Sequence, residues 1–168
     1  MIFLQPVGHV NTDILNFLNK SLKVIWQTEI LPNIDISSDA YNKNRGQYEG
    51  LALLKTFQIR GDATLGITEV DTYIEGLNFI FGLALGKKAL ISLKRLKPDF
   101  YGLDDDEVFK LRVLKEAVHE LGHVFGLKHC PNRKCVMHFS NSIRDTDVKN
   151  WMYCGNCLGE IRIDITHK

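Results

Sequence analysis

The sequence lacks several features that would place it in whole classes of protein. No apolar run approaches the ~20 residues that a membrane-spanning helix requires, so we expect no membrane association. Positive and negative side chains nearly cancel at a net charge of +1, which gives no sign of a nucleic-acid partner. The segment Met1–Pro6 lacks the basic and apolar stretches of a secretion signal, and we therefore expect a cytoplasmic protein.

Cysteine is absent from Met1 to His129, and all four cysteines follow. Cys130 and Cys135 have C-x4-C spacing, and Cys154 and Cys157 form a C-x-x-C pair. These are the spacings of a four-cysteine zinc site. Because a reducing compartment disfavours disulfides, we expect one closed tetrahedral zinc site. Two disulfides in a secreted protein, or a redox-active C-x-x-C pair, are the alternatives.

The rest of the composition is that of a globular protein, with 45% apolar and 24% charged residues. Its 168 residues suffice for one domain with a substantial core, and the sequence contains no internal repeats or low-complexity segments. Strands are expected at 1–10, 30–36, 65–71, 78–85 and 89–93. Helices are expected at 12–27, capped by Asn11 or Thr12, and at 48–58, with a polar loop at 37–46. This alternation favours an α/β layer structure.

The segment His119–His129 reads H-E-x-x-H-x-x-G-x-x-H. Apolar residues spaced three and four apart before and through it predict a largely buried helix. Asp104 is the expected N-cap of this helix, with Glu107 completing a capping-box-like pair. Gly126 is expected to end the helix in a left-handed conformation, because glycine has no Cβ to clash there.

Two histidines on that helix, His119 and His123, would project side by side at the spacing that one tetrahedral zinc needs. The turn at Gly126 would bring His129 to the same metal and leave its fourth position open, as in a catalytic site. Glu120 would reach a zinc-bound water as general base, which predicts a zinc-dependent hydrolase of the metalloprotease type. Cys130 directly follows His129, so a zinc held by the cysteines would brace the third histidine. Surface histidines on an amphipathic helix are the alternative.

The longer pattern H-E-x-x-H-x-x-G-x-x-H-C-x4-C-x-M, followed by C-x-x-C, resembles the archaemetzincins, a family of metzincin zinc metalloproteases. Segments 41–48, 71–84 and 92–96 are also similar to that family, so the resemblance covers most of the chain. It implies two zinc ions per chain: a catalytic zinc bound by His119, His123 and His129, and a structural zinc bound by Cys130, Cys135, Cys154 and Cys157. Glu120 would be the general base.

The same resemblance implies that Met137 forms a hydrophobic floor beneath the catalytic zinc, although alone it would be taken as ordinary core. Phe139 stands where some metzincins have a tyrosine that touches the metal, so we expect no such role here.

The implied fold is α/β (α+β) and metzincin-like. It has a mixed, twisted five-stranded sheet with one antiparallel edge strand near 77–84, a central active-site helix and a small zinc-stapled C-terminal subdomain. One catalytic domain would span 1–168, with an upper subdomain at 1–126 and a lower one at 127–168 that contains a helix near 142–153. An extended peptide could pair with the edge strand between the two halves. A plain core strand is the simpler interpretation of 77–85.

The leading hypothesis is a monomeric zinc metallopeptidase that hydrolyses peptide bonds of peptide or protein substrates through zinc-bound water, with Glu120 as general base. A zinc-binding protein of the same fold, with little or no proteolysis and a binding or regulatory role, is the alternative. An aminopeptidase would need an acidic group near the cleft to hold the substrate amine, for which Asp71, Glu69 and Glu75 are candidates. The sequence does not determine the substrate, its side-chain specificity or how activity is regulated.

Overall fold

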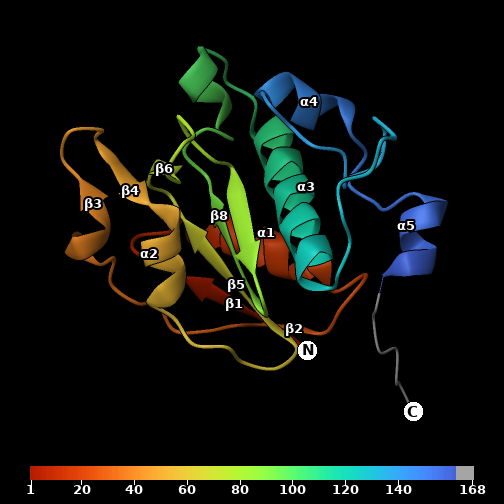
Figure 1. The fold of residues 1–168 in the computed structure, drawn as a ribbon, viewed down its shortest axis with the longest axis horizontal. Coiled ribbons are helices and arrows are strands. Elements are labelled where there is room, and N and C mark those ends of the chain that lie inside the picture. The colour runs from red at the N-terminus through yellow and green to blue at the C-terminus, as the bar shows by residue number, and fades with distance from the viewer. Residues whose placement is uncertain (162–168) are drawn as a thin grey trace.

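A mixed five-stranded sheet forms the centre of the computed structural model, which describes residues 1–161 (Figure 1). The sheet order is β2-β1-β5-β8-β7. Its strands are β1 (Ile2–Pro6), β2 (Thr28–Ile30), β5 (Ala63–Thr68), β7 (Gly82–Leu85) and β8 (Lys88–Ser92). Neighbouring strands are parallel except for β7, which pairs antiparallel with β8 and forms one edge. The predicted sheet with one antiparallel edge strand is confirmed.

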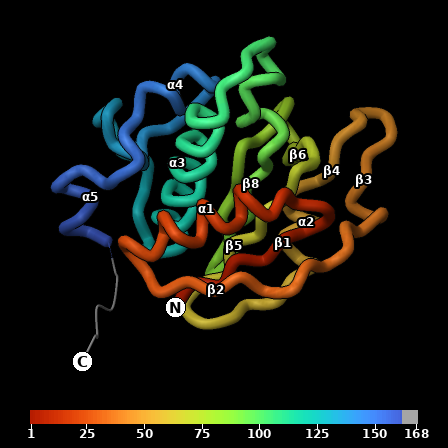
Figure 2. Tube along the Cα trace, turned by 180° about the vertical axis from the view of Figure 1, so that it is seen from behind, coloured from red at the N-terminus to blue at the C-terminus, as the bar shows by residue number. Residues whose placement is uncertain are grey.

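The two faces of this sheet are covered by different helices. Side chains of a strand alternate between faces, and in β8 Ala89 and Ile91 belong to the larger apolar cluster while Leu90 belongs to the smaller one. The larger cluster includes α1 (Thr12–Leu22) and α3 (Asp106–Val124), which lie side by side (Figure 2). The smaller cluster includes α2 (Gly50–Lys55) on the opposite face. The predicted α/β layers are therefore present.

A second, three-stranded sheet lies beside the first and was not expected. It consists of β3 (Tyr41–Asn42), β4 (Gln47–Glu49) and β6 (Thr72–Tyr73) in the order β3-β4-β6. A short 3-10 helix, η1 (Ser38–Ala40), precedes it, so the expected loop at 37–46 is only partly irregular. Strands of two or three residues are too short to show an alternation pattern, and β4 pairs with β6 from a distant part of the sequence.

Several expected boundaries are wrong. The helix expected to reach residue 27 ends at Leu22, because Ile25 and Trp26 pack against the core from the turn that follows and imitate a helical pattern. The strand expected at 30–36 overlaps β2 at Ile30 alone, because β2 ends there, and the rest of the expected range contains an isolated bridge from Ile34 to Val7. The helix expected at 48–58 is reduced to α2, and the strand expected at 78–85 to β7.

The long helix α3 begins one residue later than its expected cap implies. Asp105, not Asp104, is the N-cap, and its side chain accepts a hydrogen bond from the Val108 N–H at 3.0 Å. The capping-box-like pair of Asp104 and Glu107 was therefore wrong. At the other end Gly126 has φ +92°, the left-handed conformation that was predicted.

The C-terminal segment runs along α3 on the side away from β3 and β4 (Figure 1). It contains α4 (Ile143–Val148), where Ser142 and Asp145 form a capping box, and α5 (Gly155–Glu160). The helix expected near 142–153 is thus present but shorter. Another 3-10 helix, η2 (Pro98–Tyr101), precedes α3. The division into subdomains at 1–126 and 127–168 stays a prediction, and its last residues, 162–168, lie outside the described residues. Within 1–161, none of the helices combines the length and apolar character needed to cross a membrane.

Candidate metal centres and active-site cleft

Three histidines meet at the end of α3, as the motif predicts. His119 and His123 lie one turn apart on the helix, and the turn at Gly126 returns His129 toward them. Their nearest ring nitrogens all lie within 4.8 Å of one another. The Nδ1 atom of His119 lies 2.7 Å from the Val136 carbonyl oxygen, and that of His123 lies 2.8 Å from the Leu127 carbonyl oxygen. These contacts orient both rings so that their Nε2 atoms point inward.

The chemistry of this cluster fits a bound cation. An Nδ1 that donates to a carbonyl leaves a lone pair on Nε2, and the Nε2 atoms of His119 and His123 are 3.1 Å apart. Two facing lone pairs repel at this separation, whereas tetrahedral zinc with Zn–N bonds of ~2.0–2.1 Å would hold such nitrogens about 3.3–3.4 Å apart. Burial also lowers the pKa of all three histidines, most strongly that of His119, which keeps the rings neutral and able to bind metal.

The four cysteines form a second cluster close to the first. All four are free thiols, so the expected alternative of two disulfides is not what the structure contains. The Sγ atoms of Cys130 and Cys154 are 3.8 Å apart, and those of Cys135 and Cys157 are 3.7 Å apart. A tetrahedron with Zn–S bonds of ~2.3 Å has edges of about 3.8 Å, so the donor type and the spacing both fit zinc. A hydrogen bond from the Cys157 N–H lowers the pKa of Cys154 to about 7, whereas burial raises the pKa of Cys130 and of Cys157.

Three consecutive residues join the two clusters. Cys135 contributes a sulfur to one cluster, and the Val136 carbonyl orients His119 of the other. The Met137 carbonyl accepts a hydrogen bond from the Cys130 N–H at 2.9 Å. The Met137 side chain is fully buried and packs so closely against α3 that a Cβ at Gly122 would lie 2.4 Å from its Sδ. Movement at the cysteines would therefore be transmitted directly to the histidines.

Glu120 lies beside the histidines in a buried group of charged side chains. Glu120, Glu116 and Lys149 are 5%, 4% and 2% exposed. Burial, and next the negative charge of Glu116, raise the pKa of Glu120 well above its usual 4.5. Burial lowers the pKa of Lys149, and the attraction of the two carboxylates opposes that shift. Lys149 donates a hydrogen bond to the His138 carbonyl at 2.9 Å.

Three residues that surround Glu120 were not predicted from the sequence. Glu116 could have been found, because it lies three residues before His119 and so shares its face of the helix. Lys149 carries no local signal, since it reaches the group from the segment after α4. Gly82 of β7 is the third: a Cβ there would lie 2.7 Å from Glu120 Cγ and 2.8 Å from its Oε1. Glycine is therefore needed for the edge strand to approach Glu120.

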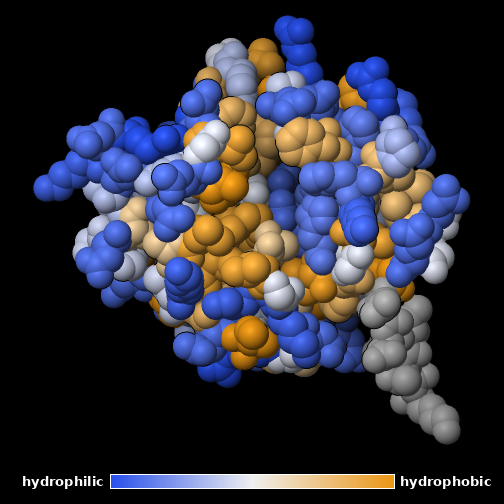
Figure 3. All heavy atoms as spheres, viewed as in Figure 1, coloured by the Kyte–Doolittle hydropathy of each residue, from blue (hydrophilic) through white to orange (hydrophobic). Residues whose placement is uncertain are grey.

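These residues line a cleft of about 450 Å³. One wall consists of β7 and the segment before it, and the other of α3 with 139–141 and Lys149. Figure 3 shows apolar residues gathered at the centre of this face, beside a hydrophilic hollow. Leu77 and Phe139 line the cleft with 50% and 49% of their surface exposed. An open cleft with apolar side chains at its edge and polar groups that point into it has the character of a substrate-binding site.

The acidic residues considered for binding a substrate amine lie elsewhere. Asp71 accepts two hydrogen bonds from Arg95, and Glu69 pairs with Lys97 at 2.7 Å. Glu75 is exposed on a turn. Within residues 1–161 none of the three lines the cleft, where Glu116 and Glu120 are the carboxylates present.

Comparisons with known proteins agree on one family. The model of peptidase family M54 matches residues 9–163. An archaemetzincin of Methanocaldococcus jannaschii is 54% identical over 165 residues, which cover 96% of this chain and 92% of the relative. The archaemetzincin of Pyrococcus furiosus is 51% identical over 177 residues, with coverage of 96% and 92%. The crystal structure of archaemetzincin from Archaeoglobus fulgidus, complexed with malonate, is similar with a TM-score of 0.86 at 42% identity, covering 95% of this chain and 99% of that one.

Proposed function

Because this chain belongs to the archaemetzincins, peptidase family M54, and is therefore a zinc metallopeptidase, we propose that it cleaves extended peptides in the cleft with Glu120 as general base. Peptides or proteins are the substrates that this family implies. A monomeric state and a cytoplasmic location are part of the same proposal.

The histidine cluster, His119, His123 and His129, would hold the catalytic zinc. Cys130, Cys135, Cys154 and Cys157 would hold a second, structural zinc, which makes two ions per chain. When bound, the catalytic ion would supply a Lewis acid that acidifies water and stabilises negative charge on the carbonyl oxygen of the substrate. Four cysteine donors complete a tetrahedron, whereas three histidines leave a position open toward the cleft, so the two sites differ in role. Met137 would form the hydrophobic floor beneath the zinc that the three histidines hold.

The position of Glu120 is the observation that carries the proposal. Its carboxylate lines the cleft next to His119, and the close approach of Gly82 keeps it against the edge strand. From there it would accept a proton from the attacking water and donate it to the leaving amine. Burial around Glu120 excludes bulk water from this exchange.

The edge strand β7 would bind the substrate backbone. Within residues 1–161, β7 pairs with β8 along one side and with no strand along the other, and it lines the cleft, so an extended peptide could add a further strand there. The exposed parts of Leu77 and Phe139 would then contact apolar side chains of the peptide on either side of the scissile bond.

The test is mass-spectrometric profiling of a diverse peptide library with the zinc-loaded protein. We expect Glu120→Gln to lower the cleavage rate about 10²–10⁴-fold, because the general base is lost, while zinc content stays unchanged. Glu107→Gln is the matched control, since Glu107 lies on the same helix with its side chain 87% exposed. The cleavage positions also distinguish an aminopeptidase from an endopeptidase.

Two results would contradict the proposal. Cleavage that persists in Glu120→Gln would remove this residue from the reaction. No cleavage by wild-type protein with its full zinc content would instead favour a zinc-binding protein with very restricted or no proteolytic activity.

A further inference from the structure

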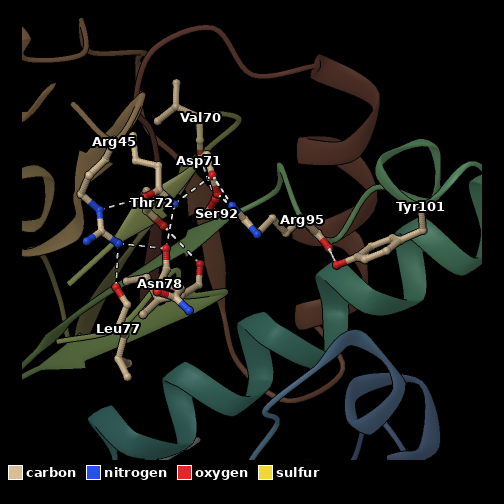
Figure 4. A network of polar contacts seen from close by, with 11 residues as sticks. Arg45, Val70, Asp71, Thr72, Leu77, Asn78, Ser92, Arg95 and Tyr101 are labelled. Atoms are coloured by element: carbon tan, nitrogen blue, oxygen red, sulfur yellow. Dashed lines mark hydrogen bonds and ion pairs between the residues drawn. The ribbon is translucent and has the colours of Figure 1, made fainter. Parts of the chain in front are cut away.

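Three segments that carry the family resemblance, 41–48, 71–84 and 92–96, supply neither a candidate metal ligand nor the general base. In the structure they converge on one polar network at the entrance of the cleft (Figure 4). The network surrounds residues 77–79, which we call the rim. The rim lines the cleft, and β7 begins shortly after it.

Arg45 lies on the turn between β3 and β4 and reaches across to the rim. Its guanidinium donates to the Leu77 carbonyl at 2.7 Å and to the Asn78 carbonyl at 3.0 Å. It also donates from Nε to Gln47 Oε1 at 3.0 Å, and its Cζ lies 3.9 Å from the centre of the Tyr73 ring. A planar group held on one face by a ring and along its edge by three acceptors has little freedom left.

Gln47 and Asp71 extend the network to the other side of the rim. Gln47 donates to Asp71 Oδ2 and to the Asn78 carbonyl, both at 3.0 Å. Asp71 in turn accepts from Arg95 at 2.7 and 2.8 Å, and the Arg95 guanidinium lies 4.5 Å from the centre of the Phe79 ring. Two arginines thus hold the rim from opposite sides, with Gln47 and Asp71 between them.

The rim needs such support because no helix or strand includes it. It follows Gly76, which has φ +86°. Within residues 1–161, the backbone hydrogen bonds of residues 77–80 are those of the Leu77 amide to the Ile74 carbonyl at 3.1 Å and of the Ile80 amide to the Thr72 carbonyl at 2.9 Å. Two consecutive rim carbonyls accept from the single side chain of Arg45.

We propose that Arg45 is a positioning residue for substrate binding: by holding the Leu77 and Asn78 carbonyls, it fixes the rim against which the peptide packs. The role in substrate binding rests on the proposed peptidase function. The hold of Arg45 on the two rim carbonyls does not depend on that function. Arg45 does not line the cleft, so its effect on the substrate passes through the rim.

Steady-state kinetics on a peptide cleaved by the wild type tests this role. We expect Arg45→Ala to raise KM about tenfold and to leave kcat within about twofold, because the rim binds substrate and takes no part in the chemistry. Arg45→Lys should recover only part of the loss, since one ammonium cannot hold two carbonyls and Gln47 together. Lys43→Ala is the matched control: it removes a like charge from the same turn, and within residues 1–161 Lys43 forms no hydrogen bond or ion pair of its side chain.

Hydrogen exchange of residues 74–81 provides a second readout that does not depend on activity. Faster exchange at Leu77 and Ile80 in Arg45→Ala, with zinc content and exchange elsewhere unchanged, is the expected result. Unchanged KM, or unchanged exchange, in Arg45→Ala would overturn the proposal. A wild type that cleaves no peptide would overturn the proposed function and with it the substrate role, while exchange would still show whether Arg45 braces the rim.

Discussion

The two walls of the cleft are held in different ways. The wall that includes α3 is anchored in the core: His119 and Glu120 are 5% exposed, and Val136 and Met137 beneath them are fully buried. The opposite wall is an edge strand and a rim whose Leu77 is 50% exposed, and polar side chains from distant segments hold it in place. The wall anchored in the core, which carries the proposed metal ligands, and the braced wall, which is proposed to bind substrate, should therefore respond differently to substitution.

The largest effect is expected at Cys135, which directly precedes Val136 beneath the anchored wall. Cys135→Ser should lower the free energy of unfolding by about 4 kcal/mol or more, because a buried cysteine that is proposed to bind metal is lost. Zinc content should fall below that of the wild type at both proposed sites, since Val136 directly after Cys135 orients His119. Denaturant unfolding and elemental analysis measure both quantities.

A chelator provides the control for this variant. When metal is removed from the wild type, its free energy of unfolding should fall to nearly that of Cys135→Ser. A difference that is unaffected by the chelator would show that Cys135 contributes packing alone, and the contrast between the walls would then not depend on metal.

A smaller effect, on kcat/KM, is expected at Gly82, where the edge strand approaches Glu120 of the other wall. The Cβ that Gly82→Ala adds would lie within 3 Å of Glu120 and of the Leu90 carbonyl, so β7 or Glu120 must shift. We expect kcat/KM to fall about 10–100-fold, because small displacements of catalytic groups are costly. Gly159→Ala is the control, since nothing lies within 4 Å of the added Cβ. Full activity of Gly82→Ala would show that the walls move independently.

The smallest effect, on stability alone, is expected at the ion pair of Glu69 and Lys97, which belongs to neither wall. Glu69 accepts from Lys97 at 2.7 Å and from the Asn11 N–H at 2.8 Å. Burial alone would raise the pKa of Glu69, but these hydrogen bonds outweigh it and lower the pKa below 4.5. Glu69→Gln should cost less than about 1 kcal/mol at neutral pH and leave kcat/KM unchanged.

The pH dependence of that small difference follows from the direction of the shift. A depressed carboxyl pKa contributes stability above the unfolded-state pKa, and the contribution is lost as the pH falls through the folded-state value. The wild type and Glu69→Gln should therefore converge in stability as the pH is lowered below 4.5. Thermal unfolding between pH 7 and pH 3 checks this, and a difference that grows on acidification would contradict it.

The anchored wall was largely predictable because its residues are close together in the sequence. The helical repeat places His119 and His123 side by side, and Gly126 had to turn the chain before His129. The N-cap was one residue off because adjacent aspartates are equivalent in sequence, and only the extended backbone at Asp105 distinguishes them. The family resemblance predicts the antiparallel edge strand, but β7 begins later than expected, because Leu77 and Phe79 of the rim alternate with Asn78 as in a strand and yet form none.

The sequence by itself determined the donor sets, their spacing, the carboxylate beside them and the mixed sheet, because short-range geometry and the family pattern specify these directly. Only the tertiary structure decided that Gly82 and Gly122 must lack a Cβ, that Lys149 shares the cleft with Glu120, and that Arg45 reaches the rim. Each of these depends on atoms separated by long stretches of chain, and the folded packing of the whole core sets those distances.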